Sequence, residues 1–75
     1  MTVYVQLLNE GTIVFRPVEA EQIDASAYRL LPVLDYQIKD EKWEFPPGTK
    51  VQCENRIFDG KNTLVAIEQI AQNHL

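Results

Sequence analysis

The fold is decided by the stretch at residues 3–15, which reads VYVQLLNEGTIVF. Apolar and polar side chains alternate along it, and a turn sequence at residues 9–11 interrupts the alternation. A three-residue loop that ends in glycine is typical of a β-hairpin in which that glycine, here Gly11, takes a positive φ. The register that follows places Leu7 opposite Ile13 and Val5 opposite Phe15. One half-buried face is therefore predicted to hold Val3, Val5, Leu7, Ile13 and Phe15. Because Pro17 donates no ladder hydrogen bond, the second strand should bend, bulge or lie at an edge near it.

A second hairpin is centred on Asp59-Gly60. A two-residue turn there pairs Cys53 with Ala66, whereas a three-residue loop over residues 58–60 pairs Cys53 with Val65. The second register gives the better apolar face, and we expect it for that reason. Phe58 then lies in the loop, partly exposed, and Gly60 takes a positive φ.

A third hairpin is predicted over residues 36–45, folding about Asp40-Glu41 and closed by a Pro-Pro-Gly turn at 46–48. Further strands are expected at residues 28–33 and from about residue 49. Residues 67, 70, 71 and 74 have helical spacing, so the C-terminus is expected to form either a short helical turn or a loose tail over residues 69–75. Five or six short antiparallel strands joined by tight turns predict a single all-β domain over residues 1–75, a small barrel.

Composition narrows the class of protein. The chain has 75 residues, 45% of them hydrophobic, and a net charge of −4. Its seven basic residues are scattered singly among acids, so nucleic-acid binding is disfavoured. The acidic excess would suit a basic protein partner. No signal-peptide pattern and no apolar run of membrane-spanning length is present, and a lone Cys53 cannot form an internal disulfide. We therefore expect a soluble, cytoplasmic protein.

The order of the elements resembles an SH3-like barrel. Gly48-Thr49-Lys50-Val51, followed by Asp59-Gly60 and Leu64-Val65-Ala66, is similar to small barrels of the Tudor and KOW kind. The stretches LLNEGT (7–12), FRPV (15–18) and WEFPPG (43–48) resemble short bacterial proteins of uncharacterised function. The resemblance implies the fold and, more loosely, a binding role, since Tudor domains bind methylated Lys or Arg and KOW domains contact RNA or ribosomal partners.

Catalytic chemistry is not expected. The single histidine, His74, is next to the last residue, where chains fray. Cys53 occupies an inward position and is interpreted as an inert, buried thiol. One cysteine and one terminal histidine do not make a four-ligand metal set. We expect no enzyme, no metal site and no cofactor.

The aromatic hairpin is the first candidate binding surface. Tyr36, Ile38, Trp43 and Phe45 share one face, and most such aromatics belong to the core of so small a barrel. We expect Phe45 and Ile38 to be buried, Trp43 to be about half covered and Tyr36 to lie at the rim. Acidic neighbours would help against a basic ligand, so the candidate site comprises Tyr36, Trp43, Asp35, Glu41 and Glu44.

A second candidate surface is predicted on the other face of the first hairpin, formed by Tyr4, Leu8, Val14 and Arg16. If Trp43 proves shielded, this surface becomes the better candidate. The functional hypothesis is a non-catalytic module that binds a protein or peptide. The alternatives are a structural subunit or homo-oligomer that buries an apolar sheet face, and an acidic inhibitor of the immunity type.

Overall fold

The computed structural model describes residues 1–32 and 42–70, and within these ranges it contains six strands and no helix. The predicted all-β class is therefore confirmed. None of the described segments is a helix long and apolar enough to cross a membrane. The strands are β1 (Thr2–Leu8), β2 (Val14–Gln22), β3 (Ala27–Leu30), β4 (Lys42–Trp43), β5 (Lys50–Phe58) and β6 (Lys61–Gln69).

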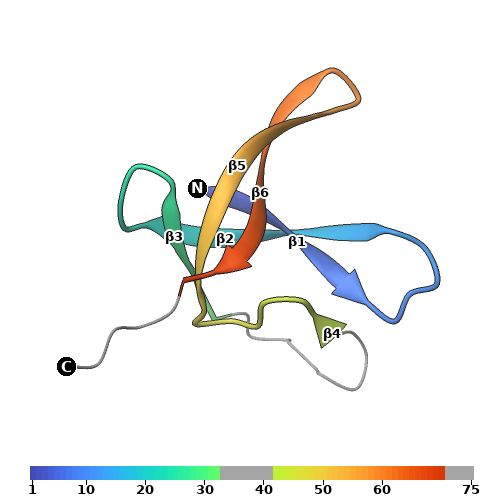
Figure 1. Ribbon diagram of the computed structural model, residues 1–75, viewed down its shortest axis with the longest axis horizontal. Coiled ribbons are helices and arrows are strands. Elements are labelled where there is room, and N and C mark those ends of the chain that lie inside the picture. The colour runs from blue at the N-terminus through green and yellow to red at the C-terminus, as the bar shows by residue number, and fades with distance from the viewer. Residues whose placement is uncertain (33–41, 71–75) are drawn as a thin grey trace.

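Five of the strands are hydrogen-bonded into a ring in the order β1, β2, β3, β5 and β6, with β6 meeting β1 again (Figure 1). Four of these pairings are antiparallel, but β6 meets β1 in parallel through the single pair Tyr4 and Val65. The prediction that all strands pair antiparallel is wrong for the pairing of β6 with β1. Direction alternates from strand to strand around the ring, and with an odd number of strands one pair must run in parallel.

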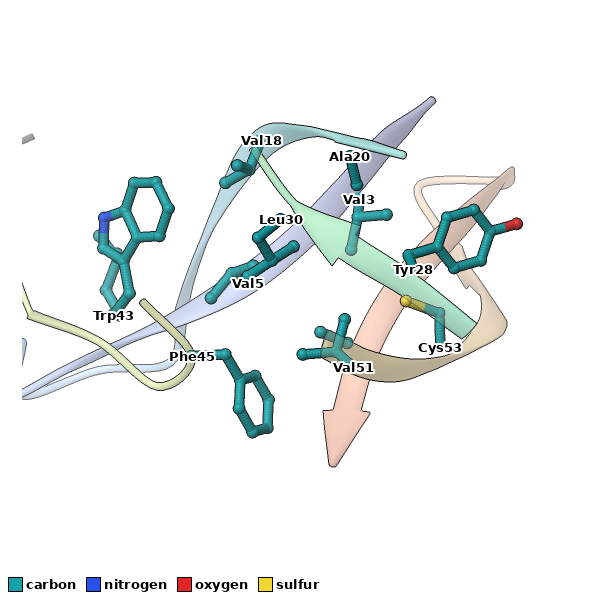
Figure 2. Packing of buried hydrophobic residues seen from close by; sticks show 12 residues of the cluster. Val3, Val5, Val18, Ala20, Tyr28, Leu30, Trp43, Phe45, Val51 and Cys53 are labelled. Carbon is teal, nitrogen blue, oxygen red and sulfur yellow. The ribbon is translucent and has the colours of Figure 1, made fainter. Parts of the chain in front are cut away.

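The core fills the inside of the ring. β1 shows the pattern most clearly, because Val3, Val5 and Leu7 are buried while the alternate residues lie on the outer side, partly covered. Figure 2 shows Trp43 and Phe45 at one end of this core and Tyr28 with Cys53 at the other. The cluster comprises Val3, Val5, Leu7, Val18, Ala20, Tyr28, Leu30, Trp43, Phe45, Val51, Cys53 and Ala66.

The first hairpin differs from its predicted register by one residue. Leu7 pairs with Val14, not Ile13, and the connection between β1 and β2 has five residues. Gly11 has a φ of 77°, which confirms its predicted conformation, but Asn9 is also left-handed at 63°. The loop is therefore two residues longer than the three-residue type that we predicted.

That one-residue shift reverses the faces of β2. Phe15, expected inside, pairs with Gln6 on the outer side of the ring, and Ile13 is 77% exposed in the loop. Val18, opposite Val3, supplies the inward side chain instead. The predicted apolar face is therefore correct for β1 and wrong for the start of β2.

Pro17 lies at an open part of β2, as expected. The backbone N–H of Ala20 donates to the carbonyl of Met1 at 2.8 Å. Ala20 and every second residue before it in β2 therefore turn their backbone groups toward β1. Pro17, three positions earlier and opposite Tyr4, has its nitrogen turned away from β1. Since β3 pairs with β2 only from Ala20 onward, proline costs the sheet no hydrogen bond here.

The second hairpin adopts the register that we rejected. Asp59 (φ 51°) and Gly60 (φ 76°) form a two-residue turn, and Cys53 pairs with Ala66. Two left-handed turn residues match the right-handed twist of a hairpin. This conformational preference of the Asp-Gly turn outweighs the number of apolar side chains on one face, on which our prediction relied. Phe58 is consequently the last residue of β5, half-buried, and not part of the loop.

Beyond the second hairpin, an irregularity between Gln52 and Cys53 makes Ile67 an unpaired extra residue in β6. The neighbouring side chains Val65 and Ala66 are both buried, although adjacent residues of a strand face opposite sides. Ala66 faces the core of the ring, and Val65 lies on the outer side next to Tyr4. At Val65 and Ala66, β6 is thus covered by apolar groups on both sides.

The segment that contains Trp43 and Phe45 packs against β1. Trp43 of β4 pairs with Leu7, and both Trp43 and Phe45 are buried. The predicted partner strand of this hairpin, with Tyr36 and Ile38, lies outside the described residues. The turn after Phe45 is closed by the amide of Thr49, which donates to the carbonyl of Pro46 at 3.2 Å, before β5 starts at Lys50.

At the C-terminus, Ile67 belongs to β6, and the other positions of the predicted helical turn that follow Ile70 lie outside the described residues.

Candidate functional site

The first predicted binding surface is not built as expected. Trp43, predicted to be half covered, is 2% exposed and lies in the core. Glu44 is exposed, while Asp35, Tyr36 and Glu41 lie outside the described residues. A buried tryptophan cannot contact a ligand, so the described part of this segment offers no aromatic rim.

The second predicted surface is divided between two sides of the sheet. Tyr4 and Leu8 lie on the outer side of β1, partly covered. Val14 and Arg16 are paired with Leu7 and Val5, so their side chains lie on the core side. The four residues do not share a face, because the prediction rested on the register that the wider loop shifts by one residue.

Arg16 is held within the fold. Its guanidinium carbon lies 5.6 Å from the centre of the Trp43 ring, a cation–π contact in which a partly buried arginine covers a buried tryptophan. The Nε of Arg16 is itself shielded from solvent, so the side chain lies against the core. Arg16 therefore stabilises the end of the core where β4 meets β1.

The outer side of the ring carries an aromatic groove. The β1–β2 and β5–β6 hairpins project from the ring in different directions (Figure 1), and a hollow of about 350 Å³ is lined by residues of both. Its aromatic walls meet where the rings of Phe15 and Phe58 approach with their centres 5.4 Å apart, tilted by 44°. We call this hollow the aromatic groove; its lining is Tyr4, Phe15, Phe58, Asp59, Lys61 and Thr63.

Strand pleating positions these side chains. Tyr4 and Phe15 both lie on the outer side of the first hairpin, since the inward positions there belong to the core. On the second hairpin, Phe58 and Thr63 share a face with Val65, which is 1% exposed and pairs with Tyr4. The aromatic lining of the groove is therefore half-buried, and the buried side chain of Val65 lies on the same face of the second hairpin.

The charges around the groove are balanced. Asp59 and Lys61 stand on either side of Gly60, both exposed. On the same face of β5, the Nε of Arg56 donates to the carboxylate of Glu54 at 2.7 Å, with both side chains about half exposed. A ligand here would meet aromatic side chains together with the hydroxyl of Thr63 and charged groups of both signs.

A second, larger hollow of about 600 Å³ lies where β3, β5 and the end of β6 meet. Its apolar lining includes Ile23, 44% exposed, and Ile70. Beside it, the side-chain amide of Gln52 donates to the hydroxyl of Ser26. Unlike the groove, this hollow has no aromatic side chain in its lining.

Cys53 is buried as predicted, and burial raises the pKa of its thiol to about 11. A thiol with so high a pKa remains protonated at neutral pH and is a poor nucleophile. Among residues 1–32 and 42–70, no group of three or more His, Cys, Asp or Glu side chains could hold a metal ion.

Of the residues that line the groove, only Tyr4 was predicted from the sequence to lie at a binding surface. Phe15 was assigned to the core and Phe58 to a loop, each through an error of one residue in a hairpin register. The Asp-Gly turn could have identified the second hairpin correctly, because the two-residue loop places Phe58 and Thr63 on one face. The meeting of two separate hairpins has no comparable signal in the sequence.

Comparisons of the chain with protein-family models, with curated proteins and with solved structures gave no match.

Proposed function

We propose that this protein is a non-catalytic binding module that takes a segment of a partner protein into the aromatic groove. The observation that supports it is the pair of half-buried rings, Phe15 and Phe58, which come from separate hairpins and pack against each other at the groove with their centres 5.4 Å apart. Side chains held in this way lose little freedom on binding and offer large apolar surfaces, which is why aromatic residues dominate binding hot spots.

The size and chemistry of the groove suit a peptide. Its volume of about 350 Å³ is at the small end of ligand pockets, enough for one or two side chains of a larger ligand. The charged groups at its margin, Asp59 and Lys61, can pair with polar groups of a ligand without demanding one sign of charge. In this proposal the ring of strands is an SH3-like barrel working in the cytoplasm, where a lone cysteine such as Cys53 remains reduced.

The test is a selection of peptides from a random displayed library against the wild-type protein, followed by measurement of their affinities for two variants. Phe58→Ala removes one wall of the groove. Asn62→Ala is the matched control, because Asn62 is an exposed residue on the opposite face of the same hairpin and lies outside the groove. We expect Phe58→Ala to weaken selected peptides at least tenfold and Asn62→Ala to leave them within twofold.

A change in folding could imitate the loss of binding, so the melting temperature of each variant is measured alongside. Equal affinities of selected peptides for wild type and Phe58→Ala, with both folded, would overturn the groove as the binding site. A selection that yields no peptide binding below millimolar concentration would count against the function itself.

A further inference from the structure

The second hairpin exposes one edge of β5 beyond the end of β3. The amide of Cys53 donates to the carbonyl of Ser26 at 2.8 Å, the last hydrogen bond between β5 and the β3 side. Residues of β5 alternate in direction, so Asn55 and Ile57 also turn their backbone groups away from β6. No residue in the ranges 1–32 and 42–70 pairs with either of them.

The open edge of β2 is protected. On β2, before its pairing with β3, the outward positions are Phe15 and Pro17, and proline has no N–H to offer. Proline at such a position is a common way of preventing an edge from pairing with another chain. β5 has no proline along residues 54–58, so its edge can accept a further strand.

We propose that the partner segment binds as an extended strand, antiparallel to β5, alongside residues 54–58. This inference rests on the proposed function, because the added strand would stand beside Phe58, at the wall of the aromatic groove. Asn55 and Ile57 each offer one N–H and one C=O, so the pairing makes four main-chain hydrogen bonds. Alternate side chains of the ligand would then lie on the groove face of β5.

The side chains on that face specify the ligand. Phe58, Arg56 and Glu54 follow one another at alternate positions. The complement in an antiparallel strand has an aromatic residue opposite Phe58, an acid opposite Arg56 and a base opposite Glu54, since such cross-strand pairs are favourable. From its N-terminus, the ligand would carry these three residues in that order with one residue between each.

A second copy of this chain is a poorer occupant of the same edge. Two β5 strands that use both free positions must pair Asn55 of each with Ile57 of the other. That register sets Arg56 directly opposite Arg56, and like charges opposite each other destabilise a strand pair. The edge therefore favours a different chain with an acid at this position.

The probe is a synthetic peptide with the core Phe-Val-Glu-Val-Lys and a threonine at each end, labelled for fluorescence anisotropy. In the proposed register its two valines face Asn55 and Ile57, and their amides point at β5. N-methylation of both valines should weaken binding at least tenfold, whereas N-methylation of the glutamate, whose amide points away, should change it less than threefold. This comparison leaves the protein unaltered.

A second measurement is made on the protein. Ile57→Pro removes an amide that the fold does not use, and Ile57→Ala retains it. We expect the first variant to lose the peptide and the second to bind it, with protection of the Asn55 and Ile57 amides from hydrogen exchange in the wild-type complex.

Three results would overturn the inference. The first is no binding of the probe at 1 mM, and the second is equal binding of both N-methylated forms. The third is a dimer of the protein alone, seen by sedimentation and abolished by Ile57→Pro, which would assign the edge to a second copy. Library peptides that depend on Phe58 but tolerate N-methylation would refute strand addition and leave the proposed groove intact.

Discussion

Truncation of Trp43 to alanine should remove most of the stability of this domain. Trp43 is 2% exposed, and Arg16 covers its ring at 5.6 Å. A buried tryptophan removes about 150–250 Å² from water, which at about 25 cal/mol per Å² corresponds to about 4–6 kcal/mol. Alanine retains a small part of this buried area, so we expect Trp43→Ala to lower the free energy of unfolding by about 3–5 kcal/mol. For a domain of this length, the total free energy of unfolding should be only about 4–11 kcal/mol.

The assay is urea unfolding followed by far-UV circular dichroism. Trp43→Phe, which retains much of the apolar volume, should lose only about 1–2 kcal/mol and remain measurable if the alanine variant does not fold. Ile57→Ala, at a site 71% exposed, should change stability by less than about 0.5 kcal/mol. In the wild type, iodide should quench Trp43 fluorescence only slightly. A loss below about 1 kcal/mol in Trp43→Ala, or strong iodide quenching, would refute the placement of this residue in the core.

Two further predictions concern the turns and the thiol. Gly11→Ala and Gly60→Ala should each lose about 1 kcal/mol, because φ values of 77° and 76° strain an alanine although no atom lies within 4 Å of the added Cβ. Melting temperatures lowered by about 4–8 °C would agree, and unchanged values in both would not. The pKa of the Cys53 thiol is raised by burial from 9.0 to about 11, so its contribution to stability is present below pH 9 and is lost as the pH rises toward 11. Urea midpoints should therefore fall more steeply between pH 9 and 11 in the wild type than in Cys53→Ala, and parallel curves would contradict the shift.

The strand content could be predicted from local patterns, but the register could not. The alternation in β1 identified Val3, Val5 and Leu7 as core residues because period-two patterning depends only on near neighbours. The position of Phe15 depends on how many residues the preceding loop takes up, and an error of one residue moves every side chain to the other face. Both hairpins contained such an error, although Gly11 and Gly60 were assigned the correct backbone conformation.

The candidate site was harder to predict for a different reason. Tyr4 comes from the first hairpin and Phe58 from the second, and they line one groove only because the ring brings β1 next to β6. A contact between strands so far apart in the sequence is a property of the closed ring. Trp43 was proposed for binding because its residue type is common in interfaces, yet a domain this small needs its largest apolar side chain inside.

The seam between β1 and β6 sets the order in which the chain can fold. Each of the two hairpins joins neighbouring strands and can form early, whereas the pair of Tyr4 and Val65 closes a loop that contains most of the chain. With a single paired position, this seam has the fewest hydrogen bonds to retain it once formed, so it should be the first part of the ring to open in native-state fluctuations. A strand bound along β5 would not touch the seam directly, but a side chain in the groove would lie beside Tyr4 and slow that opening.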